Sequence, residues 1–243
     1  MGNDLDDAGR GPSMDTAVIT GGSRGIGRAV VELFAQRGVH VVACARDRDG
    51  IEAVAAGTDA TDGSITAVRA DVRDEFDVER LMETAARVGE TEGIDCVIAN
   101  AGVYHGTAGE TPLTDESYSA FDDTLRTNVR GVFATFREAA PHLSTDARAF
   151  VPSGQIAREA VAGYGVYAVS KAGSEAIARQ FSAESGTSTA VLDLGRVATD
   201  LTGGDGRDPA DLAPMFWWAA TEADAETVDE AVLGLAEWKK ATR

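Results

Sequence analysis

Tyr167 and Lys171 are four positions apart in Y-A-V-S-K, a spacing that places both side chains on one face of a helix. A free tyrosine is a poor base at neutral pH because its pKa is about 10, whereas a neighbouring ammonium group stabilises the phenolate. The pair therefore predicts that Lys171 lowers the pKa of Tyr167, which could donate a proton to a carbonyl or accept one from an alcohol. An exposed lysine beside a packed tyrosine is the alternative interpretation of this spacing.

The glycine-rich sequence T-G-G-S-R-G-I-G at residues 20–27 follows an apolar run and precedes an amphipathic segment, the context in which such a sequence binds phosphate. Gly21 permits a tight turn, Gly25 lets the backbone approach a pyrophosphate, and Gly27 lets the helix pack closely. The N-terminus of that helix would supply N–H groups and the positive end of its dipole. A P-loop is disfavoured because R-A follows the last glycine, where a P-loop needs Lys and then Ser or Thr.

The segments that must position these motifs alternate between short apolar runs and amphipathic stretches, which is the pattern of βαβ units and a parallel sheet. Strands are expected at 16–20, 39–44, 64–69, 95–99, 149–151 and 188–192. Helices are expected at 26–37, 48–56, 74–88, 117–140, 164–184, 209–220 and 226–240. The length of 243 residues fits one large α/β domain, expected at residues 15–243, after a disordered acidic extension at residues 1–14.

Acidic residues outnumber basic ones by 40 to 22, which gives a formal net charge of −18. Binding to nucleic acid needs clustered lysine and arginine, so no nucleic-acid partner is expected, and anionic membrane surfaces are disfavoured for the same reason. The chain has three lysines, and a low lysine content under a heavy acidic load is typical of proteins from extreme halophiles of the haloarchaeal type. An ordinary acidic cytosolic protein is the alternative.

The apolar runs are too short to cross a membrane, and the first residues, M-G-N-D-L-D-D, do not have the basic and apolar parts of a secretory signal. A cytoplasmic protein is therefore expected. Cys44 and Cys96 each stand in an apolar run that resembles a strand, which favours buried free thiols. The three histidines are far apart in the sequence, so no metal site is expected.

Three further motifs accompany the glycine turn and the Tyr–Lys pair, namely A-N-A-G at 99–102, T-N-V-R-G at 127–131 and V-P-S-G at 151–154. In this order and spacing, the five motifs strongly resemble those of the classical short-chain dehydrogenase/reductase family. The resemblance runs from about Thr16 to Asp200. It implies a single-domain Rossmann-type fold, a doubly wound parallel β-sheet flanked by helices, with a nicotinamide cofactor bound across the carboxyl ends of the strands.

The resemblance also assigns roles to individual residues. Tyr167 would be the catalytic acid/base, Lys171 would bind the nicotinamide ribose, and Ser153 would hydrogen-bond the substrate oxygen as charge develops on it. Asn128 would hold the water through which Lys171 exchanges protons with solvent. The implied cofactor-binding set is Gly21, Ser23, Arg24, Gly25, Ile26, Gly27, Arg46, Asp71, Val72, Asn100, Ala101, Gly102, Tyr167, Lys171, Val197 and Thr199. In isolation, Ser153 also fits a simple turn and Thr199 a helix N-cap.

The choice between the two nicotinamide cofactors depends on the residues after the second strand. NAD favours an acidic residue there for the ribose diol, whereas NADP favours a small residue and a nearby arginine for the 2′-phosphate. Asp47 lies at a distance from Gly27 that suits NAD, but the family's acidic position falls on Ala45. Arg46 and Arg24 could both reach the phosphate, so NADP(H) is expected, with NAD(H) as the alternative.

The sequence departs from the family pattern around both ends of the site. A proline precedes Ser153, which stands fourteen residues before Tyr167, one more than is commonest in the family. In L-D-L-G a leucine replaces the family's proline before the glycine. The segment at residues 200–208 is shorter than the usual substrate lid, and the C-terminal tail lacks the usual glycine-rich ending.

These features predict an NADP(H)-dependent oxidoreductase that moves a hydride between the nicotinamide and a carbonyl or secondary alcohol. Two alternatives stay open: an NADP-binding sensor or scaffold that has lost catalysis, and an epimerase or dehydratase of the extended family, which the short C-terminal region disfavours. The small-molecule substrate could be a 3-oxoacyl thioester, a sugar, a steroid-like ketone or a small aldehyde. A homodimer or homotetramer joined through the helices of Asn128 and Tyr167 is the habit of the family. Residues 215–218, M-F-W-W, are expected in the core or at an interface.

Overall fold

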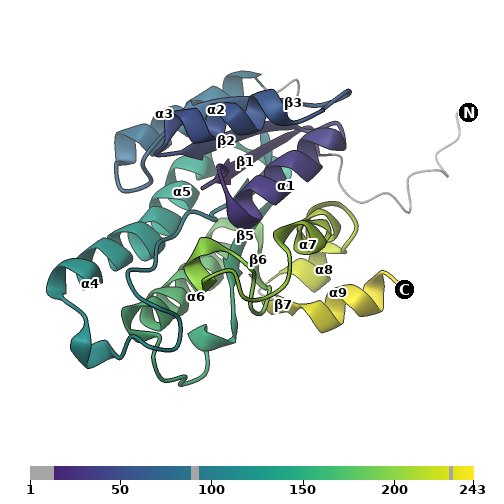
Figure 1. Ribbon diagram of the computed structural model, residues 1–243. Coiled ribbons are helices and arrows are strands. Elements are labelled where there is room, and N and C mark those ends of the chain that lie inside the picture. Colours follow the sequence, from purple (N-terminus) through teal and green to yellow (C-terminus); the bar gives the residue numbers. More distant parts are fainter. Residues whose placement is uncertain (1–13, 89–92, 230–231) are drawn as a thin grey trace, which may run out of the picture.

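The structure, a computed structural model, describes residues 14–88, 93–229 and 232–243 (Figure 1). In this part of the chain, seven parallel strands form one sheet in the order β3-β2-β1-β4-β5-β6-β7. The strands are β1 (Thr16–Thr20), β2 (His40–Ala45), β3 (Ser64–Arg69), β4 (Ile94–Ile98), β5 (Leu143–Ser153), β6 (Ser188–Asp193) and β7 (Val232–Gly234). The expected parallel α/β sheet is confirmed.

Helices cover both faces of this sheet (Figure 1). They are α1 (Gly25–Gln36), α2 (Arg48–Gly57), α3 (Glu75–Val88), α4 (Tyr118–Leu125), α5 (Gly131–Ala139), α6 (Gly165–Ser185), α7 (Pro209–Thr221), α8 (Ala225–Val228) and α9 (Leu235–Ala241). Apolar side chains of α1, α2 and α7 pack on one face, and those of α3, α5 and α6 pack on the other. Fully buried side chains such as Phe34 and Phe136 anchor the two cores, and each contributes about 2 kcal/mol by leaving water.

The centre of the sheet holds the crevice in which parallel α/β proteins bind ligands. From the neighbouring strands β1 and β4, the chain continues to opposite sides of the sheet, which separates the loops at their carboxyl ends. Asn100 Nδ2 donates to the carbonyl oxygens of Thr20 (2.9 Å) and Gly21 (3.2 Å), and Thr20 Oγ1 accepts from the Asn100 backbone N (3.0 Å). These bonds hold the glycine turn against the end of β4.

The helix expected at 117–140 is interrupted by a π-helical turn at Arg126–Arg130, which separates α4 from α5. This turn carries Asn128, whose side chain is buried. Asn128 Oδ1 accepts from the Val103 N–H at 2.8 Å, and Nδ2 donates to the Val103 carbonyl and to Ser170 Oγ, both at 2.9 Å. π-Turns of this kind are frequent at functional sites. Here the turn joins the loop after β4 to helix α6.

The prediction of a single helix at 226–240 is wrong. The chain instead forms α8, β7 and α9, while residues 230–231 lie outside the described residues. Leu233 of β7 is buried, and the pairing of β7 with β6 engages backbone groups that β6 would otherwise expose at the sheet edge. The open edge of β6 thus overrides the helical spacing of the apolar residues. β5 is also longer than expected because Leu143 pairs with Ile94 before a shift in register.

The other expected strands and helices are confirmed to within one or two residues. From the expected M-F-W-W core segment, Met215 and Phe216 are fully buried, and the Trp217 ring packs edge-on against Phe34 at 5.4 Å. Cys44 and Cys96 are buried free thiols, as expected. The expected N-terminal extension, apart from its last residue, lies outside the described part of the chain.

Candidate active site

The glycine turn between β1 and α1 has the backbone geometry that phosphate binding requires. Gly21 and Gly25 have positive φ angles of 70° and 56°, which other residues rarely adopt. A Cβ atom on Gly27 would lie 2.3 Å from the carbonyl oxygen of Gly21, so only glycine lets α1 begin this close to the turn. Within the described residues, no side chain caps α1, which leaves its first N–H groups and the positive end of its dipole available to an anion.

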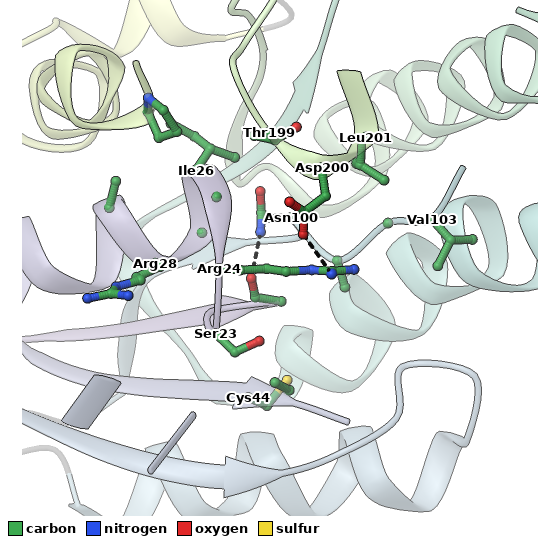
Figure 2. A pocket seen from close by; sticks show the side chains of 18 of the residues that line it. Ser23, Arg24, Ile26, Arg28, Cys44, Asn100, Val103, Thr199, Asp200 and Leu201 are labelled. Atoms are coloured by element: carbon green, nitrogen blue, oxygen red, sulfur yellow. Dashed lines mark hydrogen bonds and ion pairs between the residues drawn. The ribbon is translucent and has the colours of Figure 1, made fainter. Parts of the chain in front are cut away.

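A groove of about 680 Å³ opens over this turn, at the carboxyl ends of β1 to β4 (Figure 2). Its volume is in the range of small-molecule sites in proteins. The residues of the expected cofactor set that line it are Gly21, Ser23, Arg24, Gly25, Ile26, Gly27, Arg46, Asp71, Val72, Asn100, Ala101, Gly102 and Thr199. The uncapped helix, the glycine turn and the elongated groove fit a dinucleotide with its pyrophosphate at the turn.

The groove has a second wall that sequence reasoning missed. Leu201, Asp208 and Pro209 line it together with Thr127 of the π-turn. Asp208 and Pro209 reach it because α7 packs beside α1 in the same core, and no local motif marks such a contact between distant segments. Five expected site residues lie outside this lining as the described residues define it, namely Asn128, Ser153, Tyr167, Lys171 and Val197.

Arg24 extends across the groove to an ion pair with Asp200 (Figure 2). The distance from Arg24 Nη1 to Asp200 Oδ2 is 2.9 Å, and the two side chains are 66% and 75% exposed. An exposed pair contributes at most about 1 kcal/mol, so a phosphate group could replace Asp200 at little cost. Arg46 is exposed directly after β2 and lines the same groove. Both guanidinium groups are therefore accessible to an anionic ligand.

Asp71, expected beside the adenine, is held by Arg73. The distance from Arg73 Nη2 to Asp71 Oδ2 is 2.7 Å. Burial by itself would raise the pKa of Asp71, but the hydrogen bonds and charge of Arg73 outweigh it, and the pKa lies below its ordinary value. Arg73 also contacts Asp123 of α4 at 2.6 Å. The Asp71 carboxylate is therefore ionised at neutral pH and fixed in position.

Tyr167 and Lys171 lie one turn apart on α6. Lys171 Nζ donates to the carbonyl oxygen of Pro152 at 2.9 Å and lies 5.7 Å from the centre of the Tyr167 ring. Burial raises the pKa of Tyr167 to about 12 and lowers the pKa of Lys171 to about 8. The expectation that Lys171 lowers the pKa of Tyr167 is therefore wrong here, because the loss of water around the phenol outweighs the attraction of an ammonium group directed at a carbonyl.

Ser153 ends β5 and is buried against α6. Its hydroxyl donates to Glu175 Oε1 at 2.7 Å, and Arg158 donates to the same oxygen at 2.6 Å. The single proton of Ser153 is therefore directed at a carboxylate in this structure, and the expected contact with a substrate oxygen stays a prediction. Sequence reasoning missed Glu175 because its place two turns after Tyr167 acquires meaning only when α6 packs against β5.

Asn128 and Thr199 make hydrogen bonds within the fold. The side-chain amide of Asn128 is engaged by the contacts described above, and its backbone carbonyl accepts from Ser174 Oγ at 2.8 Å. A carbonyl oxygen can accept a second hydrogen bond, so the expectation that Asn128 holds a water for Lys171 stays a prediction. Thr199 precedes a short helical turn and its N–H donates to Thr202 Oγ1 at 3.1 Å, which agrees with the N-cap alternative. Thr199 still lines the groove and stays available to a ligand.

Comparison with known proteins places this geometry in a family. The family model for short chain dehydrogenases matches residues 15–209, which is most of the chain. The chain belongs to the short-chain dehydrogenase family. The chain spans between 15% and 43% of the length of the first three curated relatives that it matches.

Relatives of this short-chain dehydrogenase have reductase names. A 3-oxoacyl-[acyl-carrier-protein] reductase of rhamnolipid biosynthesis from Pseudomonas aeruginosa is 30% identical over 223 residues, which are 85% of this chain and 84% of the relative. A glycine betaine reductase from Emericella nidulans is 30% identical over 200 residues, which are 80% of this chain but 15% of that longer protein. A short chain dehydrogenase from Burkholderia cenocepacia, solved in complex with NADP, has a TM-score of 0.79 and 25% identity, covering 90% of this chain and 95% of the other.

The described part of this short-chain dehydrogenase contains no candidate membrane span or metal site. None of its helices there is long and apolar enough to cross a membrane. No group of three or more His, Cys, Asp or Glu side chains in the same residues is placed to hold a metal ion.

The partly buried Lys171, whose pKa is lowered by desolvation, predicts a specific pH dependence of stability. Its pKa is about 8 in the folded chain and 10.5 in the unfolded chain, so above pH 8 the unfolded chain binds the proton that the folded chain has released. The free energy of unfolding should therefore rise with pH between pH 8 and pH 10, by about 2 kcal/mol from this group. Lys171→Met should lose this rise, as measured by urea unfolding at each pH.

Lys239→Met removes an exposed lysine and serves as the control, with a pH dependence like that of the parent. The raised pKa of Tyr167 also contributes to the free energy of unfolding. This contribution is complete below pH 10.0, the pKa of tyrosine in the unfolded chain, and is lost above it, outside the measured window. Parallel curves for the parent and Lys171→Met would show that Lys171 is not desolvated.

Proposed function

We propose that this short-chain dehydrogenase is NADP(H)-dependent and moves a hydride between the nicotinamide and a carbonyl or secondary alcohol, with Tyr167 as acid/base. The observation that carries the proposal is the partly buried phenol–ammonium pair on α6, linked through Asn128 to the loop that lines the nucleotide groove. A phenol with a pKa of about 12 is protonated at neutral pH, so Tyr167 has the proton that reduction of a carbonyl requires.

The bound cofactor would supply the hydride, and the residues of the chain would supply the proton and the control of charge. In reduction, Tyr167 gives its proton to the substrate oxygen and becomes a phenolate. The Lys171 ammonium stabilises this phenolate, because opposite charges attract strongly where water is excluded. With a pKa of about 8, Lys171 carries its charge at neutral pH. Its ammonium group donates to the carbonyl oxygen of Pro152 near the end of β5.

Ser153 is proposed to contact the substrate oxygen once its hydroxyl turns away from Glu175. Arg158 keeps its own bond to Glu175 in that state, so the carboxylate would not be left buried without a partner. Asn128 is proposed to hold Val103 and Ser170 in place, which keeps the groove and α6 in register.

NADP(H) is the proposed cofactor, with the sixteen residues of the expected set as its contacts. Ala45 at the end of β2 leaves room for a 2′-phosphate, and Arg24 and Arg46 are exposed in the groove beside it. The Burkholderia cenocepacia structure, solved in complex with NADP, supports this choice. The cytoplasmic location expected from the sequence stays a prediction.

Tyr167→Phe tests the proposed chemistry. The variant keeps the ring but cannot transfer a proton, so NADPH oxidation on a panel of carbonyl compounds in molar KCl should fall by at least about a hundredfold. The affinity for NADPH, measured by fluorescence titration, should stay within about threefold of the parent because the groove is intact. Tyr118→Phe alters an exposed tyrosine, 91% accessible, and should leave both quantities unchanged.

Retained turnover in Tyr167→Phe would refute the assignment of the acid/base. A parent that binds NADPH but turns over no carbonyl compound would instead favour the non-catalytic sensor or scaffold. The hydrogen bond from Ser153 to Glu175 is the observation that favours this second candidate.

Arg46→Asp tests the choice of cofactor. Replacing the guanidinium by a carboxylate removes a charge-assisted contact to the 2′-phosphate and introduces repulsion. The ratio of kcat/KM for NADPH to that for NADH should fall by about tenfold to a hundredfold in steady-state kinetics. Arg48→Asp, two residues further on and also exposed, is the matched control and should keep the parent's ratio. Equal ratios in the parent and Arg46→Asp would rule out the proposed phosphate contact.

The exposed apolar residues of the long helices support assembly in concentrated salt. Phe121, Phe133 and Val169 on α4, α5 and α6 are 37%, 50% and 47% exposed. In molar KCl, light scattering should give a mass of two or four 25.3 kDa chains. In dilute buffer the assembly should dissociate, because charges of −18 on each copy are no longer screened. The assembly of the Phe133→Asp variant should dissociate both in molar KCl and in dilute buffer. Full assembly and activity without salt would contradict the halophilic interpretation.

A further inference from the structure

The ring of Tyr104 lies on the ring of Tyr167. The ring centres are 4.7 Å apart and the planes are inclined by 26°, an offset-stacked arrangement. Such aromatic pairs contribute about 1 kcal/mol beyond the burial of their surface. Tyr104 belongs to the loop between β4 and α4, so a segment far from α6 in the sequence covers one face of the proposed catalytic phenol.

The Tyr104 ring is anchored at its hydroxyl. Its oxygen lies 3.1 Å from the carbonyl oxygen of Gly163 and 3.1 Å from that of Thr107. The Gly163 carbonyl also accepts from the N–H groups of Gly109 (3.1 Å) and Thr111 (3.0 Å). A Cβ atom on Gly163 would lie 2.2 Å from the Gly109 carbonyl oxygen, so the two loops meet backbone to backbone. Tyr104 is therefore fixed to the joint between the β4–α4 loop and the β5–α6 loop.

This joint takes on particular importance because the segment after β6 is short. Residues 200–208 lead directly into α7, which packs with α1 in the core on the opposite face of the sheet from α6. The ring contact on Tyr167 comes instead from the β4–α4 loop.

We propose that Tyr104 is a positioning residue for the reaction, whose ring holds the phenol of Tyr167 in one orientation and keeps water from its covered face. The proposal rests on the proposed role of Tyr167 as acid/base. Tyr104 acts through Tyr167 and does not itself transfer a proton in the reaction, because its hydroxyl is directed at two backbone carbonyl oxygens. A ring fixed at both ends restricts the phenol more than an apolar side chain of equal volume would.

The electrostatic surroundings agree with this role. Burial raises the pKa of Tyr104, so Tyr104 stays neutral beside Tyr167 over the working range of pH. The other groups that face the pair are Tyr164 at the start of α6, Lys171 on α6 and Glu116 before α4, whose Oε2 accepts from the Val166 N–H at 2.5 Å. Tyr164, Lys171 and Glu116 are unchanged when Tyr104 is replaced. A change in the titration of Tyr167 therefore reports that the Tyr104 ring no longer covers the phenol.

The first experiment follows the ionisation of Tyr167 without needing a substrate. The chain has four tyrosines, so labelling the ring carbon that bears the hydroxyl gives four NMR signals, and Tyr167→Phe assigns that of Tyr167. In Tyr104→Leu, the Tyr167 phenolate should form at a pH lower by about one unit than in the parent, because water reaches the ring. Tyr104→Phe keeps the ring and should shift the titration by less than half as much. Tyr118→Leu, at an exposed site, should leave it unchanged.

The second experiment uses turnover. In Tyr104→Leu, kcat for NADP⁺-dependent alcohol oxidation should fall by roughly tenfold because the phenol is less well oriented. The rising limb of its pH profile should move to lower pH, while KM for NADP⁺ stays near the parent value. A purely structural role of Tyr104 would lower the amount of folded enzyme without moving the pH profile.

An unchanged Tyr167 titration in folded Tyr104→Leu overturns the proposal, whatever the activity of that variant. If Tyr104→Leu does not fold, Tyr104→Met fills the same space without a ring and is judged by the same titration. Failure of the proposed function gives a different result: Tyr167→Phe stays active, while the Tyr167 signal still shifts when Tyr104 is replaced. Circular dichroism at each pH verifies that every variant is folded.

Discussion

Hydrogen bonds between Thr20, Gly21 and Asn100 hold the end of β1 against the end of β4, where the chain turns to opposite sides of the sheet. The same Asn100 amide lies where a side chain on Gly27 would be, since a Cβ atom there would be 2.4 Å from Nδ2. Glycine at this position is therefore a consequence of the joint, and α1 must begin directly at the turn. The groove, the uncapped helix end and the start of the β4–α4 loop all take their positions from this contact.

A second set of bonds links that groove to the chemistry. Val103 lines the groove, and Asn128 binds both backbone groups of Val103 while it donates to Ser170, which lies on α6 between Tyr167 and Lys171. The π-turn is what allows one side chain to reach both partners. Because every polar atom of this amide is engaged in a buried place, a shift of α6 relative to the groove would leave groups without partners, at a cost of about 1–3 kcal/mol each.

Basic side chains line the groove although the chain as a whole is strongly acidic. The chain carries a net charge of −18, yet the cations Arg24 and Arg46 line the groove. Local cationic groups can attract an anionic cofactor within a protein of opposite overall charge, since screening limits distant charges to about 10 Å or less in salt. Within the described residues, the groove lining also holds five acidic residues, Glu32, Asp47, Asp71, Asp200 and Asp208, beside the three arginines Arg24, Arg28 and Arg46, so the individual arginines, and not the net charge of the groove, would hold an anionic ligand. In the buried part, Tyr167 is neutral and Lys171 titrates near neutral pH because both have lost water.

The sequence by itself determined the features that act over a few neighbouring residues. The glycine spacing at 20–27 and the Tyr–Lys spacing at 167–171 depend on local backbone geometry, and the alternation of apolar runs predicted the parallel sheet. The residues that line the groove followed from the resemblance to the family. Tertiary structure decided what depends on distant partners. The open edge of β6 made Val232–Gly234 a strand, Glu175 accepted the hydrogen bond of Ser153, the Tyr104 ring stacked on that of Tyr167, and burial raised the pKa of Tyr167. Desolvation and hydrogen bonds between packed segments set these outcomes, and spacing along the chain does not specify which segments will pack.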